Sequence, residues 1–125
     1  MNLLLDTHAL LWWLDDHPAL SQQARAAIAD GRNLVFVSAV TIWELRIKQA
    51  LGKLELPEDF QSVLEHEPFE ALDITAAHAW ETGNLPDYHR DPFDRLLIAQ
   101  AKVEGLTLVT RDAQFRPYRV PLVEA

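Results

Sequence analysis

Short apolar runs that alternate with helical patterns constrain the fold of this chain more than any other feature. Residues 3–5, 34–37 and 107–109 are rich in leucine, valine and phenylalanine, as buried strands are. Residues 69–74 form a further strand candidate, and residues 120–123 fit an edge strand. Because helix-length segments separate these runs, we predict an α/β fold, with a parallel sheet and helices on both faces.

Capping residues indicate where the helices begin and end. Serine, threonine and aspartate favour the residue before a helix, proline its first position, and glycine the residue after its end. These signals predict helices over 7–15, 21–31, 38–51, 57–66, 75–83 and 91–105, with a loop at 83–90.

The length and composition suit one globular domain spanning residues 1–125. Cysteine is absent, which excludes disulfides, a thiol nucleophile and a zinc–thiolate site. The opening segment lacks a basic region and is interrupted by Asp6, and no apolar stretch reaches the roughly 18 residues of a membrane span. We therefore expect a soluble, cytoplasmic protein that contacts no membrane.

The net charge of −8, from 19 acidic and 11 basic residues, argues against a general nucleic-acid binder. Contacts with phosphates require lysine and arginine. This objection weakens if several of the acids bind metal ions, because bound cations reverse the local sign of the field.

Four acids occupy positions that the predicted fold can bring together. Asp6 and Asp112 follow predicted strands, and ligands of open α/β sheets bind beyond the carboxyl ends of the strands. Glu44 lies about two turns into the helix after the second strand, and Asp94 lies in the first turn of the helix at 91–105. We expect these carboxylates to gather at one edge of the sheet.

Each acid also has a purely structural explanation. Asp6 and Asp112 can cap the segments that follow them, and Asp91 before Pro92 fits a helix cap better than a functional group. Asp94 at the third helical position favours the helix dipole. Glu44 is the hardest to explain in this way, because its neighbours are apolar, although Lys48 is available as an i,i+4 partner.

A cluster of four carboxylates requires a cation. Two carboxylates about 4 Å apart repel by roughly 4 kcal/mol at an effective dielectric near 20, which equals about three pK units. Oxygen ligands without thiolates select hard ions, so the expected cofactor is Mg²⁺ or Mn²⁺. Such an ion activates water for hydrolysis of a phosphodiester.

In its motifs the sequence resembles the PIN-domain ribonucleases, and among them the VapC-type toxins of bacterial toxin–antitoxin pairs. The combination of Asp-Pro-Phe-Asp-Arg with Trp-Glu-Leu and Thr-Arg-Asp is specific, whereas the opening Leu-Asp-Thr alone is weak. The matching stretches follow the expected order over nearly the whole chain, at residues 4–8, 38–48, 51–54, 89–97 and 110–112.

The resemblance implies a PIN-like three-layer fold with central strand order 3-2-1-4-5 and a metal-dependent endoribonuclease. The metal-site acids carry over to Asp6, Glu44, Asp94 and Asp112, with Asp91 as a secondary candidate. Thr7 and Thr110 are expected to orient carboxylates through their hydroxyls. The family also implies an RNA substrate, homodimers and a cognate antitoxin.

Other interpretations remain open at this level. One is a receiver-like module that holds Mg²⁺ for phosphoryl signalling, although a glutamate within a helix fits it poorly. A phosphatase with an aspartate nucleophile is disfavoured, because Asp6-Thr7-His8 lacks a second acid two residues after Asp6. The third is an inert interaction protein in which the acids are helix caps. His8 and His89 lie near the presumed site, but a hard cation does not select imidazole, so no catalytic role is predicted for them. Trp12 can be either exposed at a partner groove or part of the core, and Arg95 is expected to be a buried pairing partner.

Overall fold

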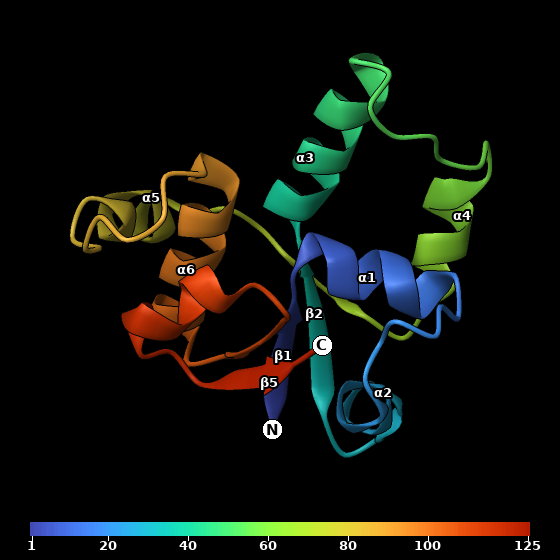
Figure 1. Ribbon diagram of the computed structural model, residues 1–125, viewed down its shortest axis with the longest axis horizontal. Helices are drawn as coiled ribbons and strands as arrows, with labels where there is room; N and C mark the ends of the chain where they lie inside the picture. Colours follow the sequence, from blue (N-terminus) through green and yellow to red (C-terminus); the bar gives the residue numbers. More distant parts are fainter.

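The computed structural model describes residues 1–125 and contains one sheet of five parallel strands in the order β3-β2-β1-β4-β5 (Figure 1). The predicted central order 3-2-1-4-5 is confirmed. Receiver-like proteins have the order 2-1-3-4-5, so this topology excludes the receiver alternative. The strands are β1 (Asn2–Leu5), β2 (Leu34–Ser38), β3 (Glu70–Leu72), β4 (Thr107–Thr110) and β5 (Leu122–Glu124).

Helices cover both faces of this sheet, as predicted (Figure 1). On one side lie α1 (Thr7–Leu14) and α2 (Gln22–Ala29), with α4 (Phe60–Glu65) beyond α1. On the other side lie α5 (Ala76–Thr82), α6 (Pro92–Glu104) and the 3₁₀ helix η1 (Ala113–Tyr118). Helix α3 (Ala39–Ala50) continues from β2 past the carboxyl edge of the sheet.

Successive side chains of each strand point to opposite faces of the sheet, which divides the core into two layers. Leu3 and Leu5 of β1 pack with the layer that contains α1 and α2, whereas Leu4 between them packs with α6. Val109 and Leu108 of β4 divide in the same way. Because both faces of the sheet are buried, each strand needs apolar residues at successive positions rather than an alternation of apolar and polar residues.

Most predicted helix starts have the expected caps. The side chain of Ser21 accepts a hydrogen bond from the backbone of α2, that of Ser38 from α3 and that of Thr75 from α5. Helix α6 ends at Gly105, which adopts a left-handed conformation with φ 67° and ψ 40°. Local sequence signals therefore determine where these helices begin and end.

The connection between α3 and β3 differs from the prediction. The carbonyl of Pro57 accepts a hydrogen bond from the amide of Phe60, so residues 57–60 form a turn and the helix begins at Phe60 rather than at Pro57. Strand β3 covers only Glu70–Leu72 of the predicted 69–74, because β2 ends at Ser38 and offers no partner beyond it. At the other edge, β5 is shifted toward the C-terminus relative to the predicted 120–123.

No helix of the protein combines the length and the apolar character that a membrane-spanning segment needs.

Candidate metal centre

Asp6 lies directly after β1, and both its backbone and its side chain are engaged. Its amide donates to the carbonyl of Val109 in β4 at 3.1 Å, and its Oδ1 accepts from the amide of Ala9 at 2.8 Å, which caps α1. The side chain is almost fully buried, and this burial raises the pKa of Asp6, against the lowering effect of hydrogen bonds with Thr110 and Ala9. The structural explanation of Asp6 as a helix cap is thus correct, and the capping bond uses only Oδ1 of the carboxylate.

Glu44 points inward from α3 and is only 5% exposed. Its Oε1 accepts from the Thr7 hydroxyl at 2.7 Å, and its Oε2 contacts Lys48 Nζ at 2.7 Å. The hydrogen bond to Glu44 raises the pKa of Lys48. A hydroxyl from α1 and an ammonium group one turn further along α3 therefore hold this carboxylate, in accordance with the i,i+4 pairing considered above.

Asp94 lies in the first turn of α6, and its pKa is strongly raised. Burial, together with the negative charges of Asp91, Glu44 and Asp6, raises the pKa of Asp94 to about 7, while His89 opposes this shift. The carboxylates of Asp91, Glu44 and Asp6 are therefore within electrostatic range of Asp94. Asp91 itself caps α6, because its Oδ1 accepts from the amides of Phe93 at 2.8 Å and Asp94 at 3.2 Å.

Asp112 joins the group from the far side of β1, just after β4. Its Oδ1 accepts from the amide of Gln114 at 2.9 Å and so caps η1, while the Asp112 amide donates to the Thr110 hydroxyl at 3.1 Å. Its Oδ2 lies 3.2 Å from Nε2 of His89. Thr110 thus connects to both Asp6 and Asp112, the two acids on either side of the β1–β4 pair.

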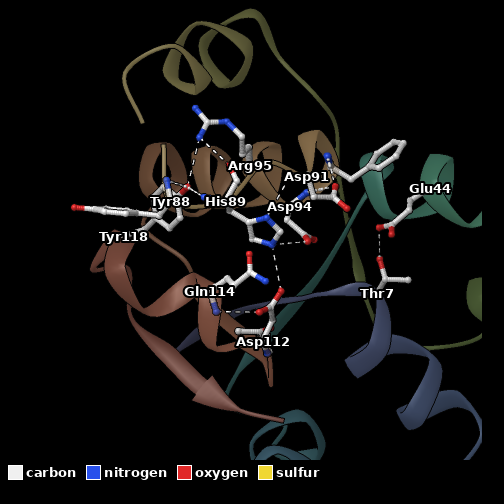
Figure 2. A network of polar contacts seen from close by, with 12 residues as sticks. Thr7, Glu44, Tyr88, His89, Asp91, Asp94, Arg95, Asp112, Gln114 and Tyr118 are labelled. Carbon is white, nitrogen blue, oxygen red and sulfur yellow. Dashed lines mark hydrogen bonds and ion pairs between the residues drawn. The ribbon is translucent and has the colours of Figure 1, made fainter. Parts of the chain in front are cut away.

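His89 lies between Asp94 and Asp112 (Figure 2). No catalytic role is predicted for this histidine from the sequence. Its Nε2 is 3.0 Å from Asp94 Oδ2, and candidate ligand atoms of the three residues all lie within 4.8 Å of one another. The signal that could have identified it is local: His89 stands two residues before the Asp91 cap, and its Nδ1 accepts from the Asp91 amide at 3.2 Å.

This donor set fits a hard divalent cation. Carboxylates from separate parts of the chain lie near one another, and burial, followed by the charges of neighbouring acids, raises the pKa of Asp94. Lys48 is the only lysine or arginine in contact with the cluster, and it pairs with Glu44. A bound Mg²⁺ or Mn²⁺ would supply positive charge here, and carboxylate oxygens are the ligands that these ions prefer.

Two residues outside the cluster, Arg95 and Trp12, can be compared with the sequence-based expectations. Arg95 pairs with no acid; its guanidinium donates to the carbonyls of residues 82, 85, 86 and 89 and so binds the loop before α6. Trp12 is partly buried, with the guanidinium of Arg111 4.5 Å from the centre of its ring, and it also lines a groove between α1 and α4. Both alternatives for Trp12 therefore hold in part.

Comparison with known proteins agrees with this architecture. Residues 3–120 match the model of the PIN domain family. Ribonuclease VapC22 of Mycobacterium tuberculosis is 33% identical over 123 residues, covering 96% of this chain and 94% of that protein.

Solved structures share the fold at lower identity. VapBC2 from Rickettsia felis, bound to a DNA fragment from the promoter, is 23% identical over 99% of this chain and 98% of that chain, with a TM-score of 0.73. FitAcB from Neisseria gonorrhoeae is 24% identical over 98% and 96%, with a TM-score of 0.66. The family match over nearly all of the sequence, together with the full-length relative, shows that this chain belongs to the PIN domain family, among its VapC-type members.

Proposed function

We propose that this protein is a Mg²⁺- or Mn²⁺-dependent endoribonuclease and the toxin of a toxin–antitoxin pair. The observation that carries the proposal is the convergence of Asp6, Glu44, Asp94 and Asp112, with the pKa of Asp94 raised to about 7 by burial and by neighbouring acids. A 33% identical ribonuclease of nearly equal length supports the same activity.

In this proposal the four carboxylates hold the cation, and the surrounding hydroxyls fix their orientation. Thr7 holds one oxygen of Glu44, and Thr110 supports Asp6 and Asp112. When bound, the ion lowers the pKa of a coordinated water and stabilises negative charge at the phosphodiester. Asp91 serves mainly as the cap that sets the first turn of α6 and thereby the direction of Asp94.

The proposed partners are an RNA substrate, a cognate antitoxin and a second copy of this chain, all in the cytoplasm. The solved relatives include VapBC2 from Rickettsia felis and VapBC from Salmonella typhimurium, both bound to DNA. An apolar groove of about 430 Å³ between α1 and α4, lined in part by Trp12, Leu56 and Phe60, supports binding of a protein partner. A catalytically inert interaction protein remains the competing hypothesis, and the following test separates the two.

The test is RNA cleavage by the purified protein with Mg²⁺ or Mn²⁺ and with EDTA. We expect cleavage that EDTA abolishes and that Glu44→Gln reduces by about 10³-fold or more, on the scale of losses from removing an essential electrostatic group. Glu58→Gln is the matched control, because Glu58 is an exposed acid outside the cluster. Equal cleavage by wild type and Glu44→Gln, or no cleavage of any RNA with either ion, contradicts the proposal.

A further inference from the structure

His89 is a buried imidazole among the acids of the proposed site, and the proposed function assigns it no role. It is 7% exposed and lies in the loop between α5 and α6. Its Nε2 is 3.0 Å from Asp94 Oδ2 and 3.2 Å from Asp112 Oδ2 (Figure 2). These two acids belong to different elements, and no other side chain forms a hydrogen bond or ion pair with both of them.

The hydrogen bonds of His89 determine which nitrogen carries the proton. Nδ1 lies 3.2 Å from the backbone amide of Asp91. A backbone N–H can only donate, so Nδ1 is the acceptor and the proton of the neutral ring is on Nε2. A protonated nitrogen has no lone pair for a metal, so Nε2 faces the carboxylates as a donor rather than as a ligand.

We propose that His89 is a positioning residue of the metal site: its Nε2–H bridges Asp94 and Asp112 and keeps both carboxylates within reach of one cation. Without a donor between them the two carboxylates repel and turn apart. This inference rests on the metal-binding part of the proposed function.

The loop is built to hold this imidazole in place. The Tyr118 hydroxyl accepts from the amides of Tyr88 at 3.1 Å and His89 at 2.7 Å. Arg95 Nη1 lies 3.3 Å from the His89 carbonyl and 3.4 Å from the Tyr118 hydroxyl (Figure 2). The ring of Phe115 lies 5.7 Å from that of His89, centre to centre. Contacts with the protein itself therefore hold both the backbone and the ring of His89 in place.

The experiment measures binding of Mn²⁺ alone to the purified chain, by electron paramagnetic resonance of the free ion. In His89→Asn the shorter amide can still meet the Asp91 amide but does not reach the carboxylates, whereas in His89→Gln the longer side chain carries an N–H to about the Nε2 position. We expect His89→Asn to weaken Mn²⁺ binding by about 10- to 100-fold, as loss of a residue that orients metal ligands does, and His89→Gln to restore most of that loss.

Tyr118→Phe provides a second variant that leaves the imidazole intact. It removes the acceptor for two loop amides, so we expect a smaller loss of Mn²⁺ affinity, and no further loss when it is combined with His89→Asn. Circular dichroism establishes that each variant is folded. If His89→Asn does not fold, the Tyr118→Phe result decides: a measurable loss of affinity supports the inference, and wild-type affinity overturns it.

Three other results overturn the proposal: unchanged or tighter Mn²⁺ binding by folded His89→Asn, no restoration by His89→Gln, or a directly bonded imidazole nitrogen in pulsed electron paramagnetic resonance of the Mn²⁺-loaded protein. Asp94→Asn separates this failure from that of the proposed site. If Asp94→Asn binds Mn²⁺ as tightly as wild type, the carboxylate site itself is wrong. If Asp94→Asn loses binding and His89→Asn does not, only the role of His89 is wrong.

Discussion

At the scale of single residues, two acids of the proposed metal site also cap helices. Asp6 caps α1 and Asp112 caps η1, each through Oδ1, and Oδ2 of Asp112 lies 3.2 Å from Nε2 of His89. A cap fixes the side-chain torsions of the residue that makes it, because the amide it bonds belongs to a rigid helix. The structural and the functional explanations of these acids are therefore compatible, and the first prepares the geometry of the second.

The hydroxyl of Thr7 provides a direct test of how the carboxylates are held. Thr7→Val keeps the shape of the side chain but removes the 2.7 Å hydrogen bond to Glu44. We expect Mn²⁺ affinity and RNA cleavage to fall by about 10- to 100-fold. Isothermal titration calorimetry measures the binding directly.

The matched control is Thr41→Val on α3. The Thr41 hydroxyl is buried and has no hydrogen-bond partner, so its removal should leave metal binding unchanged and leave the stability unchanged or slightly higher. Equal effects of the two substitutions would show that the Thr7 hydroxyl has no specific role.

The raised pKa of Asp94 predicts how the stability of the metal-free protein depends on pH. The pKa is about 7 in the folded chain against an ordinary 3.8, so between about pH 4 and pH 7 the folded state keeps a proton that the unfolded state has lost. Because the unfolded state then binds fewer protons, the free energy of unfolding falls as the pH rises through this window. Urea denaturation in EDTA should show wild type losing stability relative to Asp94→Asn from pH 4 to pH 7, and a constant difference would contradict this.

At the scale of elements, the residues that begin and end α6 determine where the helix places Asp94. Asp91 and Pro92 start the helix, and Gly105 ends it with φ 67°, a conformation that other residues adopt only under strain. The first turn places Asp94 at the site, and the last turn returns the chain to β4. The two ends of α6 therefore place Asp94 near the other acids and lead the chain into β4.

Gly105→Ala should lower the free energy of unfolding by about 1 kcal/mol, because alanine in the left-handed region is strained. A Cβ at this position meets no atom within 4 Å, so the cost is conformational rather than steric. Gly31→Ala is the control, since a Cβ there also meets nothing within 4 Å and φ is not in the left-handed range. Thermal denaturation of both variants tests this, and equal stabilities would contradict it.

At the scale of the whole molecule, the parallel sheet brings the carboxyl ends of β1, β2 and β4 to one edge. That edge brings together acids from all three thirds of the sequence, in a protein whose net charge is already −8. The repulsion at this edge is a cost of folding that a cation bound at the proposed site would remove. Cation binding and folding should therefore be coupled.

Addition of Mn²⁺ should raise the melting temperature of the wild-type protein, and EDTA should reverse the increase. A ligand at about 100 times its Kd stabilises the state that binds it by about 2.7 kcal/mol, which for a domain of this size corresponds to several degrees. Asp94→Asn should reduce the shift, whereas Asp59→Asn, at an exposed acid that caps no helix with its side chain, should not. Differential scanning calorimetry measures this, and an equal shift in both variants would contradict binding at the proposed site.

The amino-acid sequence by itself determined the features that depend on local interactions. Apolar runs identified the buried strands, and caps such as Ser38 and Gly105 identified most helix ends, because these signals act within a few residues. The strand order came from the family resemblance rather than from local pattern. The helix start at Pro57 was predicted wrongly, since a proline suits a turn as well as a helix start.

Only the tertiary structure decided which side chains meet at the sheet edge. His89 lies between Asp94 and Asp112 because the loop before α6 is bound by Arg95 and Tyr118, contacts that span up to 30 residues of sequence. No local pattern encodes such a meeting: it arises when separate elements pack, and the resulting burial raises the pKa of Asp94. Residue types and spacing identify the acids as candidates, but only packing determines the distances between them and brings His89 into contact with Asp94 and Asp112.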